Sequence, residues 1–207
     1  MRRVSLFLVF ACLLPYLALA APLTPAQVAT YTAQLQDNDA ERMQLAANAL
    51  AADKQVGALL AALKSDDKAR RTCVIYALPQ CLTPAAMDAL IAVVTKDPDA
   101  RVRNTALSIA SAAVARPELK EKQAALLAAC KAATRDTDAF VACNAVINIT
   151  KMQPDCTDLL LDILANGPNP MARSQAAGML VMPDRKDPRI YDALVKAGLM
   201  VRHTESP

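Results

Sequence analysis

The chain has 207 residues, enough for one domain or a short array of repeats, and 54% of them are hydrophobic although only 3% are aromatic. A formal charge of +3, without a cluster of basic side chains and interleaved aromatics, gives no electrostatic support for nucleic-acid binding. Four glycines and no tryptophan are poor material for a β-sandwich or barrel, whereas abundant alanine and leucine favour closely packed helices.

Residues 1–20 resemble a secretory signal peptide. Arg2 and Arg3 precede an apolar run over residues 4–14, and Ala18-Leu19-Ala20 supplies the small-x-small pattern that signal peptidase recognises. The apolar run is shorter than the about 20 residues that a membrane-spanning helix needs. We expect cleavage after Ala20 and export to the periplasm or secretion, with no membrane span in the mature chain.

Two variants of this signal fit the sequence less well. A lipid anchor at Cys12 conflicts with the apolar sequence that follows this residue, and a twin-arginine signal conflicts with Ser5, which stands where phenylalanine is preferred. Either variant would still export the chain. The expected mature protein, with 21 basic and 20 acidic residues, comprises a repeat domain at 21–200 and a polar tail at 201–207.

One pattern recurs five times along the chain. A short polar loop carrying Asp or Asn leads into a helix with a small or basic residue every third or fourth position. The copies span residues 39–50, 67–78, 99–110, 138–149 and 169–180, and the first and fourth lack the basic residue. A second run with helical spacing follows each copy, at 55–63, 84–96, 119–133, 156–165 and 188–199. Loops fall at prolines between these runs.

The copies, clearest in Asp99, Arg103, Ala106 and Ile109, resemble HEAT repeats of the short bacterial type also found in bilin lyases. The resemblance covers about residues 26–200 and implies an all-α solenoid of about five antiparallel helix pairs. Because one helix pair cannot bury its apolar face alone, neighbouring pairs must stack. An ordinary antiparallel helical bundle is the alternative.

Three arginines occupy one repeat position, and a helix-capping residue precedes each by four. The pairs are Asp67 with Arg71, Asp99 with Arg103, and Asn169 with Arg173. The HEAT resemblance implies that they form a polar ladder, capping helix starts and bridging neighbouring repeats. The alternative is a basic row for an acidic ligand.

Five cysteines follow the expected cleavage site: Cys73, Cys81, Cys130, Cys143 and Cys156. Export favours disulfides. Cys130 and Cys143 lie symmetrically about one turn, and Cys73 and Cys81 lie on either side of another, so both pairs are candidate bridges. The alternative is five reduced cysteines that pack as small apolar residues.

Catalytic signals are weak. His203 is the only histidine, and it lies in the polar tail, so neither a Ser-His-Asp arrangement nor a multi-histidine metal site is available. No phosphate-binding glycine loop occurs either. We therefore expect a protein that is not an enzyme, without catalytic, metal or cofactor residues.

The leading hypothesis is a cell-envelope scaffold that binds a protein or peptide in a groove lined by the second helix of each pair. Their positions along the helical repeat predict six exposed contacts there: Lys64, Asp88, Lys96, Lys131, Asp162 and Lys196. One alternative is a bilin-lyase-like enzyme or another ligand-handling protein built on HEAT-like repeats. Another is a cap module in a larger envelope assembly.

Overall fold

The computed structural model describes residues 22–200, so the expected signal peptide at 1–20 and the polar tail at 201–207 lie outside the described residues. Within that range the chain is all-α. Its helices are α1 (Pro25–Gln34), α2 (Ala40–Ala52), α3 (Val56–Ala62), α4 (Lys68–Ala77), α5 (Pro84–Lys96), α6 (Ala100–Ala113), α7 (Gln123–Ala133), α8 (Ala139–Met152), α9 (Thr157–Asn166), α10 (Pro170–Leu180) and α11 (Arg189–Lys196), with 3-10 turns at Leu78–Gln80 and Pro117–Lys122. None of these described helices is long and apolar enough to cross a membrane.

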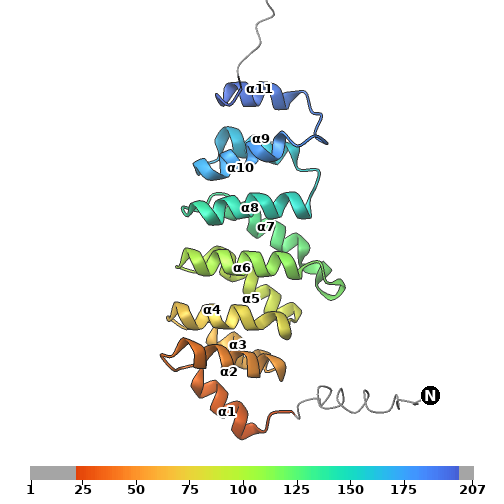
Figure 1. The fold of residues 1–207 in the computed structure, drawn as a ribbon. Helices are drawn as coiled ribbons and strands as arrows, with labels where there is room; N and C mark the ends of the chain where they lie inside the picture. The colour runs from red at the N-terminus through yellow and green to blue at the C-terminus, as the bar shows by residue number, and fades with distance from the viewer. Residues whose placement is uncertain (1–21, 201–207) are drawn as a thin grey trace, which may run out of the picture.

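The helices form two parallel rows (Figure 1). The first-helix row contains α2, α4, α6, α8 and α10, and the second-helix row contains α3, α5, α7, α9 and α11. Each first helix packs against its neighbours in the row and against a helix of the second row. This two-row stack confirms the predicted α-solenoid of five antiparallel helix pairs, with α1 added at its N-terminal end.

Every first helix begins at a side chain that caps it. Asp39, Asp67, Asp99, Asp138 and Asn169 each accept hydrogen bonds from backbone N–H groups in the first turn of the helix that follows. A cap of this kind satisfies donors that have no partner inside the helix. The caps explain why the repeated polar loops set the starts of all five helices.

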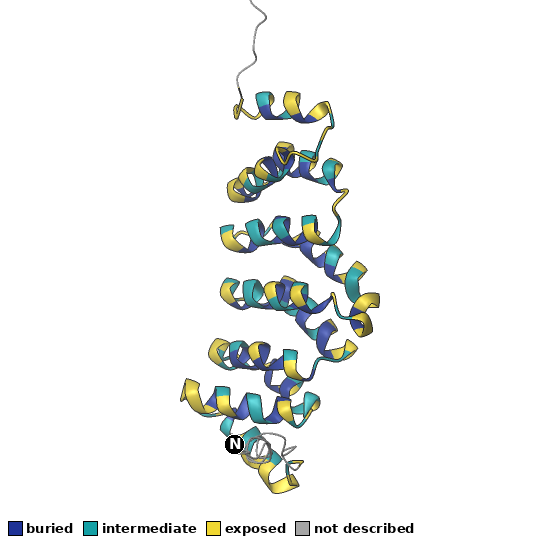
Figure 2. Cartoon of the chain, turned by 45° about the vertical axis from the view of Figure 1, so that its right-hand side comes forward, coloured by how far each residue is buried: buried dark blue, intermediate teal, exposed yellow. Residues whose placement is uncertain are grey.

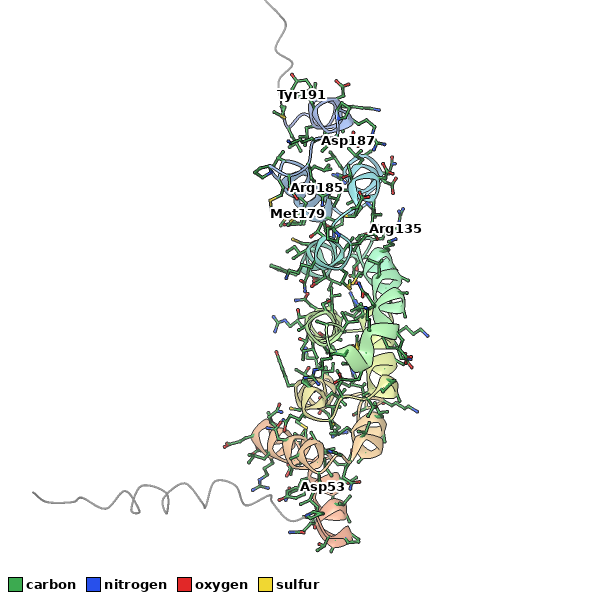
Figure 3. The ribbon with its side chains drawn as sticks, turned by 90° about the vertical axis from the view of Figure 1, so that its right-hand side faces the viewer. Asp53, Arg135, Met179, Arg185, Asp187 and Tyr191 are labelled. Atoms are coloured by element: carbon green, nitrogen blue, oxygen red, sulfur yellow. The ribbon has the colours of Figure 1, made fainter. Side chains whose placement is uncertain are left out.

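The C-terminal helix α11 is shorter than the predicted run at 188–199. It ends at Lys196, and Gly198 follows with a φ of +73°, a conformation that glycine adopts at helix ends without a steric penalty. Arg185, labelled in Figure 3, ties the preceding loop to α9 by donating to the Thr157 hydroxyl at 2.9 Å and the Pro154 carbonyl at 2.9 Å.

Burial follows one side of each helix, and the buried sides of the two rows face each other (Figure 2). At the central position of each helix, the two rows bury side chains of different size. The central small position of the first helices holds Ala46, Val74, Ala106, Ala145 and Ala176, all fully buried. The second helices bury leucines instead: Leu59, Leu90, Leu126, Leu160 and Leu194. Because interaxial distance depends on the side chains at the contact, alanine lets the first helices approach more closely.

This difference bends the stack. The first-helix row lies on the inner side of a shallow curve and the second-helix row on the outer side (Figure 3). The prediction that second helices line the groove is therefore wrong, because the alanine-rich helices pack closer and take the inner side. The solvent-exposed side of the first-helix row is termed the inner face.

Candidate binding surface on the inner face

The loops before the first helices carry a ladder of ion pairs. Arg71 of α4 places its guanidinium against the Asp97 carboxylate, with Nε to Oδ2 at 2.7 Å and Nη2 to Oδ1 at 2.8 Å. Both side chains are almost fully buried, at 6% and 3% exposed. Arg71 Nη1 also donates to the carbonyls of Ser65 and Asp66 at 2.8 and 2.9 Å. The pair thus joins one repeat to the next with all three nitrogens engaged.

The next junction repeats this geometry. Arg103 Nε and Nη2 each lie 2.7 Å from the Asp136 carboxylate, and Arg103 Nη1 donates to the Asp97 carbonyl at 2.8 Å. Asn169 then continues the ladder by donating to the Asp136 carbonyl at 3.0 Å. The ladder therefore runs from α4 to α10 through the loops.

The arginine acceptors differ from the residues singled out in the sequence. Asp67 and Asp99 cap their own helices, whereas the arginines bind Asp97 and Asp136, two residues before a cap. The overlooked signal was an Asp-x-Asp spacing, in which the first aspartate also accepts the N–H of the second. Arg173 does not bridge repeats within the described residues, and its one contact is with the Gly167 carbonyl at 2.8 Å.

The Asp136 pair predicts a pH dependence of stability. Burial of the Asp136 carboxyl opposes ionisation, but hydrogen bonds from Arg103 and the Asp138 N–H outweigh burial and hold its pKa below 3.8. A depressed folded-state pKa gives stability that is present above the unfolded value and lost as pH falls through the folded value. We expect Asp136→Asn to lower the free energy of unfolding most at pH 7, and this deficit to shrink below about pH 4. Urea unfolding of both proteins at several pH values measures the deficit, and a deficit independent of pH would contradict the assignment.

The five cysteines within residues 22–200 are free, contrary to the predicted bridges Cys130–Cys143 and Cys73–Cys81. The predicted pairs rested on equal distances from a turn and did not consider which side of its helix each cysteine occupies. Cys130 is buried beside Ser111 of α6, in its own helix pair, while the Cys143 thiol faces Gln175 of α10 in the next pair at 3.4 Å. The two thiols therefore point away from each other. Cys73 faces the Ala40 carbonyl of α2 at 3.9 Å, and Cys81 is buried after the 3-10 turn.

Thiol labelling distinguishes free cysteines from bridges. Burial raises the pKa of the Cys130 thiol to about 12, so this sulfur stays protonated and inert. Cys143 is only half-buried, and we expect it to react first with iodoacetamide at pH 8. In denaturant without reductant, protein expressed from Ala21 onward is expected to expose five reactive thiols. Three reactive thiols would indicate one disulfide bridge and one reactive thiol would indicate two, and either count would contradict the free cysteines.

The middle of the inner face carries no charged side chain. Positions five, six and nine residues after each N-cap lie on one side of a helix. Across the five first helices these positions are Gln44, Leu45, Asn48, Thr72, Cys73, Tyr76, Asn104, Thr105, Ser108, Cys143, Asn144, Ile147, Ser174, Gln175 and Gly178. Charged side chains on this side, such as Glu41, Arg101 and Lys151, lie in the first or last helical turn and so at the edges of the face.

Amide side chains link neighbouring helices across this face. Asn144 Nδ2 donates to Asn104 Oδ1 at 2.8 Å and to Ser108 Oγ at 3.0 Å. Gln44 and Gln80 both donate to Asn48 Oδ1, at 3.2 and 3.1 Å. A side-chain amide has two donor hydrogens and an acceptor oxygen. The NH2 groups of Asn48 and Asn104 have no partner among the described residues and can donate to a bound molecule.

Large apolar side chains stand beside the amides. Leu45 is 61% exposed, Tyr76 57%, Phe140 76% and Met171 50%. Leu45 and Tyr76 lie in the uncharged middle, and Phe140 and Met171 lie at the edge where α8 and α10 begin. The inner face therefore combines hydrogen-bonding amides with apolar contacts, as ligand and peptide sites do.

The outer side of the stack has the opposite character. The six predicted contacts belong to the second-helix row or its loops, and all six are exposed: Lys64, Asp88, Lys96, Lys131, Asp162 and Lys196. Asp88 forms an ion pair with Lys122 at 2.8 Å, and Asp162 accepts from Asn166 at 2.8 Å. These contacts are typical of a solvated helix surface.

No cluster of His, Cys, Asp or Glu within the described part of the chain could hold a metal ion. His203 lies outside the described residues.

Comparisons with known proteins show a likeness to solved structures. No family model matches the chain, and no curated protein matches it. The chain is similar to a chain in the complex of CpcE and CpcF of phycocyanin lyase from Nostoc sp. PCC7120, with a TM-score of 0.55 and 18% sequence identity. The match covers 75% of this chain and 99% of that chain. At this identity the likeness shows a shared helical-repeat fold.

Proposed function

We propose that the chain is a binding protein that holds an extended, uncharged polypeptide segment along its inner face. The observation that carries the proposal is the uncharged, amide-lined middle of this face, which includes the exposed Tyr76 and Leu45 and lies opposite a charged outer side. An extended segment presents unpaired N–H and C=O groups, which side-chain amides can bind without a charge. The exposed apolar side chains would supply contacts between these hydrogen bonds.

The signal-like N-terminus extends the proposal to the compartment. We infer that the chain works outside the cytoplasm, because residues 1–20 have the pattern of an export signal. Fusing these residues to a reporter enzyme that is active only after export tests this point. Reporter activity is expected, and replacing Ala18 and Ala20 by bulky residues should leave the fusion exported but uncleaved. A fusion without reporter activity would contradict export.

Binding is best tested with a displayed library of random peptides. We expect selected peptides to be poor in charged residues. Asn104→Asp keeps an acceptor for Asn144 but removes the free NH2 and adds a negative charge to the face, so affinity should fall on the order of tenfold or more. Ala128→Asp adds the same charge at an exposed position of α7 on the outer side and should leave affinity unchanged. Equal losses in both variants, or a uniformly charged set of peptides, would contradict the proposal.

The second candidate is a bilin-lyase-like protein that handles a linear tetrapyrrole with a partner subunit. The likeness to the CpcE–CpcF complex favours it, and also favours a protein partner in general. The uncharged inner face fits it less well, since the acidic side groups of a tetrapyrrole call for cations. Titration with a bilin separates the two candidates: a saturable change in visible absorption at one equivalent would favour the lyase-like function, and an unchanged spectrum would favour peptide binding.

A further inference from the structure

The arginine ladder follows a pairing rule at every junction between first helices. The donor lies four residues after one N-cap, and the acceptor lies two residues before the next. Arg71 meets Asp97 and Arg103 meets Asp136 in this way. At the other two junctions both side chains are missing. Met43 stands at the donor position and Ser65 at the acceptor position of the first junction, and Ala142 and Gly167 stand at these positions of the last. The two side chains therefore occur together or not at all.

Arg173 of α10 breaks this rule. It stands at the arginine position of the last first helix, and its Nη1 donates to the Gly167 carbonyl at 2.8 Å. The same nitrogen of Arg103 donates to the Asp97 carbonyl at 2.8 Å, so the two guanidinium groups share the contact that orients them. Arg173 Nε and Nη2, which hold a carboxylate in the other two arginines, have no partner among the described residues.

Arg173 lines a surface pocket. The pocket has a volume of about 460 Å³, and its lining includes Arg173, Asn166, Ser174 and Leu199. Leu199 is 56% exposed, and Leu164, Ala165 and Ala197 also line the pocket. A planar guanidinium with two free parallel donors matches a carboxylate, and the apolar side chains near it suit the rest of an interface.

We propose that Arg173 binds an aspartate or glutamate carboxylate of a partner protein that docks on the α10–α11 end of the stack. The carboxylate would occupy the place that Asp97 and Asp136 take inside the stack, with one oxygen at Nε and the other at Nη2. This site borders the inner face at Ser174, but its charged donor Arg173 lies outside the uncharged middle of that face. Asn104→Asp tests peptide binding and Arg173→Lys tests carboxylate binding, so the two proposals can fail independently.

Nuclear magnetic resonance of the arginine Nε–H groups tests the proposal. The probe is a capped peptide with the sequence of residues 95–101, which carries Asp97 and Asp99, and the control peptide has asparagine at both positions. The Arg173 Nε–H signal is expected to shift saturably with the probe, with affinity on the order of tenfold weaker for the control peptide. Arg71 and Arg103 already bind Asp97 and Asp136, so their Nε–H signals serve as internal references and should not shift.

Variants make the outcome decisive. Arg173→Lys keeps the charge but loses the paired donors. Because this variant has no Arg173 Nε–H signal, its binding is followed by fluorescence anisotropy of the labelled probe peptide. Affinity should fall on the order of tenfold, while the Arg71 and Arg103 signals confirm folding. A wild-type signal that does not move, or that moves equally with both peptides, would overturn the proposal. So would a shift that appears only in Glu205→Gln, because the chain's own carboxylate would then be the occupant.

Discussion

Replacing Arg71 with methionine is expected to lower the free energy of unfolding by about 3–5 kcal/mol. The variant would leave the Asp97 carboxylate, 3% exposed, without a counter-charge. It would also leave the carbonyls of Ser65 and Asp66 without the donor that Arg71 supplies. Breaking a buried pair costs more than the pair itself contributes, because the remaining charge stays desolvated. Equilibrium unfolding in urea at pH 7 measures the loss.

Two further variants check this explanation. Arg101→Met removes an exposed arginine of α6 whose side chain has no partner among the described residues, and should change stability by less than about 0.5 kcal/mol. Arg71→Met with Asp97→Asn removes the stranded charge while keeping an oxygen for the Asp99 N–H, and should be more stable than Arg71→Met alone. If the double variant is the less stable one, the buried charge is not the cause.

Leu107→Ala is expected to cost about 2–5 kcal/mol, because it opens a cavity at a fully buried position of α6 in the middle of the stack. In a solenoid each repeat is stabilised mainly by its neighbours, so a weak central repeat uncouples the two halves. We therefore expect the single unfolding transition of the wild type to broaden or split. Calorimetry combined with urea unfolding shows both effects.

Leu45→Ala is the matched control for this prediction. The same side chain is removed from α2, but Leu45 is 61% exposed on the inner face, and the change should stay within about 0.5 kcal/mol. Equal losses at Leu45 and Leu107 would mean that the core does not lie between the two rows as described.

The fold was accessible from the sequence because its signals are local. Asp39, Asp67, Asp99, Asp138 and Asn169 cap the helices that follow them, and each lies in a polar loop that the repeat pattern exposes. The central small residues, such as Ala106 and Ala145, are fully buried and repeat at the same place in each first helix. Helical spacing and capping therefore define the elements and their stacking without long-range information.

The candidate site was not accessible in the same way. Which row takes the inner side of the curve depends on the relative spacing of alanine-lined and leucine-lined helices, a difference that accumulates over the whole stack. The arginine acceptors Asp97 and Asp136 are 26 and 33 residues from their donors. The predicted cysteine pairs were wrong for a related reason, since residues that flank a turn can point away from each other.

The most direct test of the inner face as a binding surface is to map a selected peptide onto the chain by backbone amide chemical shifts. Peptide binding is predicted to shift amides of the first helices at the uncharged middle of the inner face, above all near Asn48, Tyr76, Asn104, Asn144 and Gln175. The chemical shifts of outward-facing amides in α5, α7 and α9 should not change. Shifts confined to the outer residues, such as Asp88, Lys131 and Asp162, would contradict the inner face as the binding surface.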